Sequence, residues 1–120
     1  MDQNTFLNLP TESIAQLMRQ AGSKVCGFPV NGTRRWLMLE SQTLNMQDGY
    51  IDAMSAPHTA AYRMLFEHGV HTLLAPVYGP DLFERGDAYT EMSTHGLAQT
   101  VQNRYFLDLY DQCNLRVGYY

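Results

Sequence analysis

A run of polar and basic residues, Asn31-Gly32-Thr33-Arg34-Arg35-Trp36, offers the most chemistry in this sequence of 120 residues. Gly32 lets a ligand approach the backbone closely, and the side chains of Asn31 and Thr33 can form hydrogen bonds. Two adjacent guanidinium groups donate paired hydrogen bonds that match phosphate oxygens. The first amides of a helix beginning here would add to the same anion site. The run therefore predicts a diphosphate cradle, and spacing alone leaves open the alternative of a surface turn with two solvated arginines.

A second polar segment covers residues 78–87 and includes Tyr78, Asp81, Phe83 and Arg85. Its Gly79-Pro80-Asp81 sequence is typical of a turn that ends an apolar stretch. Asp81 and Arg85 could face the first run and support the anion site. Taken alone, such a segment is more often a structural turn with a helix cap.

Regular elements must hold these two segments together. The predicted elements are helices over residues 11–21, 55–68 and 87–112, and strands over residues 24–30, 71–77 and 115–120. Pro57 is expected in the first turn of its helix. The secondary structure of residues 36–40 is ambiguous from the sequence. Residues 42–49 are expected to form a loop, and residues 1–9 a loose arm. Strands that alternate with helices predict an α/β domain with a mainly parallel sheet. Both polar segments then follow carboxyl ends of strands, where sites in such sheets lie.

Composition narrows the function classes. The net charge is −4 and Lys24 is the single lysine, so a general nucleic-acid surface is not expected. The sequence has no apolar run long enough to span a membrane and no leader-like start, which predicts a cytoplasmic protein. Cys26 and Cys113 are expected to be free thiols. His68 and His71 have no evident third ligand, so no protein metal site is predicted.

The order of these motifs resembles the cis-prenyltransferase (undecaprenyl diphosphate synthase-like) family over residues 24–120. That family opens with a strand running into Asp-Gly-Asn-(Gly/Arg)-Arg-Trp, which is similar to residues 31–36 here. Its next strand and loop resemble residues 71–85, and a later Arg-Val strand resembles Leu115-Arg116-Val117. The Gly-Thr-Arg-Arg-Trp motif is also similar to that of a bacterial branch of the family whose members are diterpene-synthase-like.

The resemblance implies the front part of a layered α/β fold, a single incomplete domain over residues 1–120. It implies a transferase or terpene-synthase-like enzyme that acts on an allylic isoprenoid diphosphate, with Mg²⁺ as a companion of the diphosphate. A homodimer, or a second chain that completes the fold, is expected. The catalytic residues would be Asn31, Arg35 and Asp81. The substrate-binding residues would be Gly32, Thr33, Arg34, Arg35, Trp36, Tyr78, Phe83 and Arg85.

Departures from the family pattern leave alternatives open. Asn31 replaces an aspartate, and an amide cannot act as a base. The family's later Arg-x-x-x-Ser-x-Arg motif does not occur in these 120 residues. A catalytically silent prenyl-phosphate-binding or partner-binding subunit, or a truncated gene product, is therefore the alternative. His58 and Tyr50 match a family phosphate-contacting histidine equally well, whereas the spacing of Met64, Met92 and Tyr105 favours core or tunnel wall.

Overall fold

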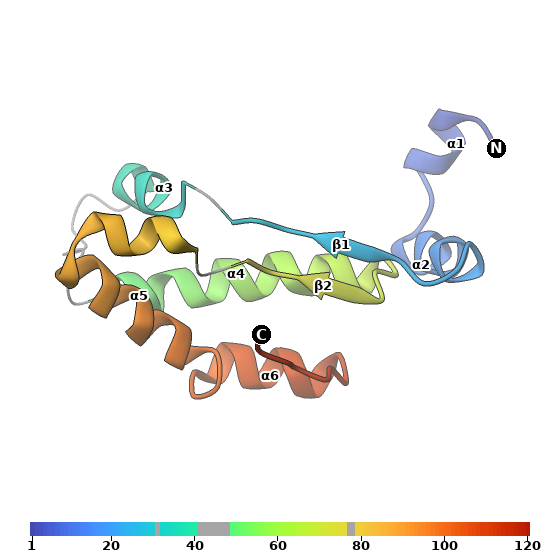
Figure 1. The fold of residues 1–120 in the computed structure, drawn as a ribbon. Coiled ribbons are helices and arrows are strands. Elements are labelled where there is room, and N and C mark those ends of the chain that lie inside the picture. The colour runs from blue at the N-terminus through green and yellow to red at the C-terminus, as the bar shows by residue number, and fades with distance from the viewer. Residues whose placement is uncertain (31, 41–48, 77–78) are drawn as a thin grey trace.

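The computed structural model describes residues 1–30, 32–40, 49–76 and 79–120 (Figure 1). Asn31, Tyr78 and most of the expected 42–49 loop lie outside the described residues. In chain order, the elements are α1 (Gln3–Leu7), α2 (Thr11–Gln20), β1 (Val25–Gly27), α3 (Thr33–Glu40), α4 (Tyr50–Glu67), β2 (Thr72–Leu74), the 3₁₀ helix η1 (Pro80–Arg85), α5 (Asp87–Gln99) and α6 (Arg104–Gln112).

The two strands pair in parallel, with Cys26 of β1 opposite Leu73 of β2. This two-stranded sheet, counted over the described residues, confirms the predicted α/β class and parallel direction. Each strand has three residues, whereas seven were predicted. Prolines limit the ladder, because Pro29 and Pro76 follow the strands closely and have no backbone N–H to donate.

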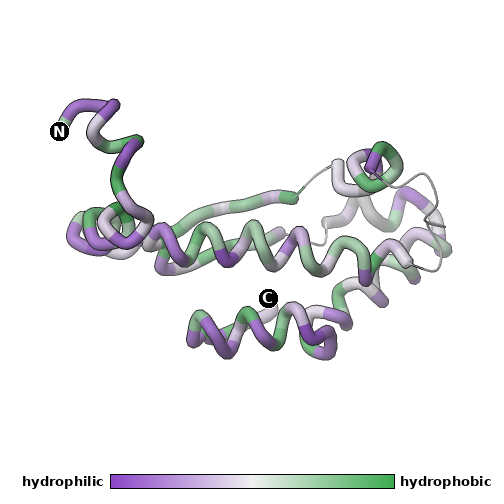
Figure 2. The backbone as a smooth tube through the Cα atoms, turned by 180° about the vertical axis from the view of Figure 1, so that it is seen from behind, coloured by the Kyte–Doolittle hydropathy of each residue, from purple (hydrophilic) through white to green (hydrophobic). Residues whose placement is uncertain are grey.

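The core lies where α4 meets α6 beside the strands. Its buried cluster consists of Tyr62 from α4 with Phe106 and Leu109 from α6, and Phe28 and Leu73 pack against it. Figures 1 and 2, which view the chain from opposite sides, both show α4 alongside β2 and α6 alongside α4. The apolar residues of α6 lie three apart on one face, which explains why this short helix packs here.

The molecule is extended around this small core. Its radius of gyration is 16.8 Å, compared with about 14 Å for a compact domain of this length. Figure 1 shows α1 standing apart from the other elements, and none of its residues is buried. Within the described parts of the chain, no helix is long and apolar enough to cross a membrane.

Gly69 joins α4 to β2 and allows α2 to pack closely. It has a φ of 92°, and Gly69 N and Val70 N donate to the carbonyls of Phe66 and Leu65, which closes α4 with a Schellman turn. A side chain here would place Cβ 2.8 Å from Met18 Cβ. Glycine is therefore required at this junction for both conformation and space.

Helix α4 begins at Tyr50, five residues before the predicted start, so Pro57 lies inside the helix rather than in its first turn. Proline removes one helical N–H and crowds the preceding turn. Side chains bond to carbonyls on either side of it: Ser55 Oγ donates to Ile51 O, and Thr59 Oγ1 donates to Ser55 O at 2.9 Å. Burial of this part of α4 outweighs the local breaker signal that set the predicted boundary.

The predicted helix over residues 87–112 is two helices, so that prediction was wrong. α5 ends at Gln99, and Asn103 caps α6 by accepting a hydrogen bond from Tyr105 N at 2.9 Å. Asparagine favours such a cap over a helix interior because its side chain competes for backbone groups. The break turns α6 so that its apolar face meets α4, where Arg63 donates a hydrogen bond to Gln112.

The predicted strand over residues 115–120 is also wrong, because this segment pairs with neither β1 nor β2. Asn114, with a φ of 50°, reverses the chain after α6. Leu115 then packs against the core cluster and Val117 lies at the cavity described below. The apolar pattern that suggested a strand therefore reflects contact with the helices.

Candidate functional site

Parallel pairing brings the ends of both strands to the same side of the molecule. The chain leaves β1 toward α3 and leaves β2 toward η1, and Figure 1 shows α3 near η1 and the start of α5 at one end. The sequence predicted this common edge from the order of the elements. We call this end, residues 32–36 with 79–85, the mouth.

The end of the first polar run and the apolar residues that follow it form a helix. Residues 36–40, which the sequence left ambiguous, belong to α3, and Trp36 N donates to Gly32 O at 3.0 Å. Gly32 has a φ of 77°, a backbone conformation that favours glycine. The run thus begins a helix, whose first amides have no partner within the helix and attract anions.

Thr33 connects the mouth to α4. Its Oγ1 lies 2.6 Å from Tyr50 Oη in a partly buried hydrogen bond. Tyr50 is the first residue of α4, and His58 follows eight residues later, about 12 Å along the helix. Of the two residues that matched the family's phosphate-contacting position, Tyr50 is therefore the one that contacts the predicted cradle.

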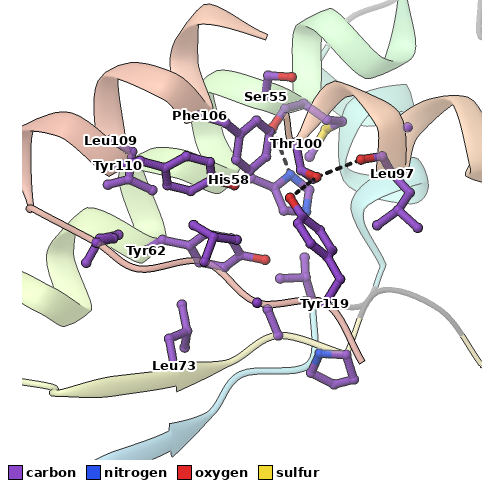
Figure 3. A pocket seen from close by; sticks show the side chains of 18 of the residues that line it. Ser55, His58, Tyr62, Leu73, Leu97, Thr100, Phe106, Leu109, Tyr110 and Tyr119 are labelled. Atoms are coloured by element: carbon purple, nitrogen blue, oxygen red, sulfur yellow. Dashed lines mark hydrogen bonds between the residues drawn. The ribbon is translucent and has the colours of Figure 1, made fainter. Parts of the chain in front are cut away.

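A cavity of about 790 Å³ extends from Thr33 and Tyr50 along the inner side of α4 (Figure 3). Its walls come from β2, α4, α5, α6 and the segment after α6, and they include Met54, Tyr62, Met92, Phe106, Leu109 and Tyr110. The volume is within the range of small-molecule sites, which are mostly apolar and aromatic with a few polar groups. The cavity suits a long hydrocarbon with a polar end at the mouth.

Several polar groups along the cavity have protein partners. The ring Nδ1 of His58 lies 2.8 Å from Met54 O, so Nδ1 carries the proton and donates to this carbonyl. Among the described residues, no buried side-chain nitrogen or oxygen lacks a hydrogen bond. Polar groups that are already paired within the protein offer fewer hydrogen bonds to a ligand, which favours an apolar ligand along this part of the cavity.

Two tyrosines of this lining show the effect of burial. Desolvation raises the pKa of the Tyr62 hydroxyl above its ordinary value of 10.0. Desolvation also raises the pKa of Tyr110, and the charge and hydrogen bonding of Tyr119 raise it further. Both hydroxyls stay neutral at physiological pH, which keeps the cavity free of negative charge.

The predicted site residues that the structure describes lie in two places, the cavity and the mouth. Thr33 lines the cavity and Gly32 precedes it, whereas Arg35, Trp36, Phe83 and Arg85 are exposed at the mouth. Arg85 stacks on Tyr89, with its guanidinium carbon 5.2 Å from the ring centroid, and donates to Tyr89 Oη at 3.3 Å. Asn31, Tyr78 and the side chains of Arg34 and Asp81 lie outside the described residues. The roles of these residues remain predictions.

Sequence reasoning missed most of the cavity wall. Met92 lines the cavity, as the core-or-tunnel interpretation expected, but Met64 and Tyr105 are exposed, so that interpretation was wrong for them. Tyr62, Tyr110 and Tyr119 were not singled out. The spacing of Phe106, Leu109 and Tyr110 on one helical face was the available signal, and the predicted unbroken helix placed that face incorrectly.

No protein-family model matches the chain. A curated protein, tuberculosinyl adenosine transferase of Mycobacterium tuberculosis (strain CDC 1551 / Oshkosh), is 35% identical to it over 120 residues. The match covers 100% of this chain and 40% of that protein, so the chain spans well under half the length of this relative. The identity supports a relationship to prenyl-type transferases.

Proposed function

We propose that the chain binds an allylic isoprenoid diphosphate, with the diphosphate at the mouth and the hydrocarbon in the cavity. The observation that carries this proposal is the position of Thr33. It is the first residue of α3, adjacent to the two arginines, and it also lines the aromatic cavity. A ligand with a phosphate head and a long apolar tail matches both parts of the site at once.

The activity we propose is transfer of the prenyl group to an acceptor. The carbon–oxygen bond to the diphosphate breaks, its electron pair leaves with the diphosphate, and an acceptor captures the allylic cation. Arg35 and the first amides of α3 would stabilise the negative charge that develops on the leaving group. The name of the relative supports this reaction class, with a tuberculosinyl group as the transferred unit in that protein.

Mg²⁺ is proposed as a companion of the diphosphate. Its preferred ligands are oxygen atoms, which the diphosphate supplies. The Asp81 carboxylate and the Asn31 amide oxygen, which lie in or next to the mouth segments of the sequence, could supply further oxygens. When bound, the ion would neutralise charge on the leaving diphosphate. The cis-prenyltransferase-like layered fold, a homodimer and a cytoplasmic location belong to the same proposal.

A silent prenyl-phosphate-binding subunit is the second candidate. The asparagine at position 31, where the resembled family has an aspartate, favours it, because an amide cannot accept a proton as a carboxylate does. The same residue makes a terpene-synthase-like reaction more suitable here than chain elongation.

An assay of diphosphate release tests these candidates. The full chain is incubated with geranyl, farnesyl or geranylgeranyl diphosphate and Mg²⁺, with and without adenosine as the acceptor. The proposed transfer predicts release above the rate without protein, and prenylated acceptor as product. Binding without release, weakened by Arg35→Ala, would favour the silent subunit. The absence of both binding and release would contradict the proposal.

A further inference from the structure

The chain reverses sharply after α6 and runs back across the cavity. Asn114 N donates to Asp111 O, and Leu115 N donates to Tyr110 O at 2.8 Å. These two bonds, with Asn114 in the left-handed conformation, form a Schellman turn. Residues 115–119, which we call the strap, then line the cavity, and Figure 3 shows Tyr119 of this segment among the lining side chains.

The hydroxyl of Tyr119 fastens the far end of the strap. Tyr119 Oη lies 2.8 Å from Oγ1 of Thr100, the residue that directly follows α5. Thr100 Oγ1 donates its own proton to Leu97 O at 2.7 Å. Tyr119 must therefore be the donor and Thr100 the acceptor, so this bond connects the strap to the break between α5 and α6.

Few other contacts secure the strap, apart from the interaction of Tyr119 with the Tyr110 side chain. It belongs to no sheet, and Val117 and Tyr119 are 42% and 54% exposed. Leu115 packs on the core cluster at the near end. A segment with exposed backbone and few buried contacts opens at a lower free energy than the whole domain. The near end thus resembles a hinge, and the far end a latch.

We propose that the strap is a movable side wall that admits the hydrocarbon and closes over it, with the Tyr119–Thr100 hydrogen bond as the latch. The wall lies beside Tyr62, Phe106 and Leu109, so its closure completes the apolar lining. This inference rests on the proposed function for the identity of the ligand. The latch itself depends only on the contacts above.

Tyr119→Phe removes the latch, together with the interaction of this hydroxyl with Tyr110, and keeps the ring. Tyr120→Phe is the matched control, because Tyr120 is fully exposed and does not line the cavity. In the ligand-free chain, we expect amide hydrogen exchange of residues 115–119 to quicken about threefold to tenfold in Tyr119→Phe and to stay unchanged in the control. In a double-mutant cycle, Thr100→Val should add little once Tyr119 is replaced. Equal exchange in Tyr119→Phe and Tyr120→Phe would overturn the latch.

Geranylgeraniol serves as the ligand, since it has the hydrocarbon without the diphosphate. Its dissociation, followed by stopped-flow displacement, should be about threefold to tenfold faster in Tyr119→Phe than in Tyr120→Phe. Equal dissociation rates would overturn gating by the strap. Exchange that responds to Tyr119→Phe in a chain that does not bind geranylgeraniol would reject the proposed ligand and still support the latch.

Discussion

The mouth and the cavity differ in how they are built. At the mouth, Arg35, Trp36 and Phe83 are exposed and lie in short helices. In the cavity wall, Tyr62 and Leu109 are buried, and they come from helices distant in sequence. The residues for polar chemistry are therefore close together in sequence and form a recognisable motif, whereas the apolar half of the site forms only when α4 and α6 pack together.

The largest effect should follow from a change in the cavity wall. Leu109 is 1% exposed, and Leu109→Ala should lower the free energy of unfolding by about 2–5 kcal/mol because it leaves a void in the small core. The matched control is Leu39→Ala in α3, where the side chain is 81% exposed and the change should stay within about 0.5 kcal/mol. Denaturant unfolding measures both. Equal losses would contradict the division into a structural cavity and an exposed mouth.

A smaller effect should follow where the two regions meet. Thr33→Val removes the hydrogen bond to Tyr50 and keeps the shape of the side chain, so it should cost about 0.5–1.5 kcal/mol of stability. Tyr50→Phe removes the same bond from the other side. In a double-mutant cycle measured by denaturant unfolding, the second change should add little to the first. Fully additive losses would show that this bond does not join the mouth to α4.

The smallest effect is expected from alkaline pH. Tyr62 and Tyr110 have raised pKa values in the folded chain because burial disfavours the phenolate. Their neutral forms contribute full stability below pH 10, and this contribution decreases as the pH rises above 10 toward the folded pKa values. At about pH 10.5 the loss should be under about 1 kcal/mol for each tyrosine.

Denaturant unfolding as a function of pH measures this loss. Tyr62→Phe should make the decrease shallower, whereas Tyr105→Phe, at an exposed position of α6, should leave it unchanged. A stability that is constant from pH 9 to 11 would contradict the burial of these hydroxyls.

Sequence reasoning succeeded where local signals and topology agree. The apolar runs before Gly32 and Gly79 predicted parallel strands, and their order predicted that both polar segments reach one edge. It failed where tertiary contacts decide. Asn103 ends a helix-like pattern by capping α6, and Pro57 is accommodated inside α4, outcomes that depend on how these helices pack together.

Titration calorimetry shows whether the mouth binds the diphosphate and the cavity binds the hydrocarbon. Geranylgeranyl diphosphate and geranylgeraniol are each titrated, with and without Mg²⁺, into the unaltered chain and into the variant Arg35→Ala. The control variant is Arg104→Ala, because Arg104 lies on α6 and pairs with Asp108. We predict that Arg35→Ala weakens binding of the diphosphate about tenfold to a hundredfold and leaves the alcohol unaffected, because only the diphosphate receives the charged hydrogen bonds. Equal affinity of the unaltered chain for both ligands, or equal losses in the two arginine variants, would contradict the account.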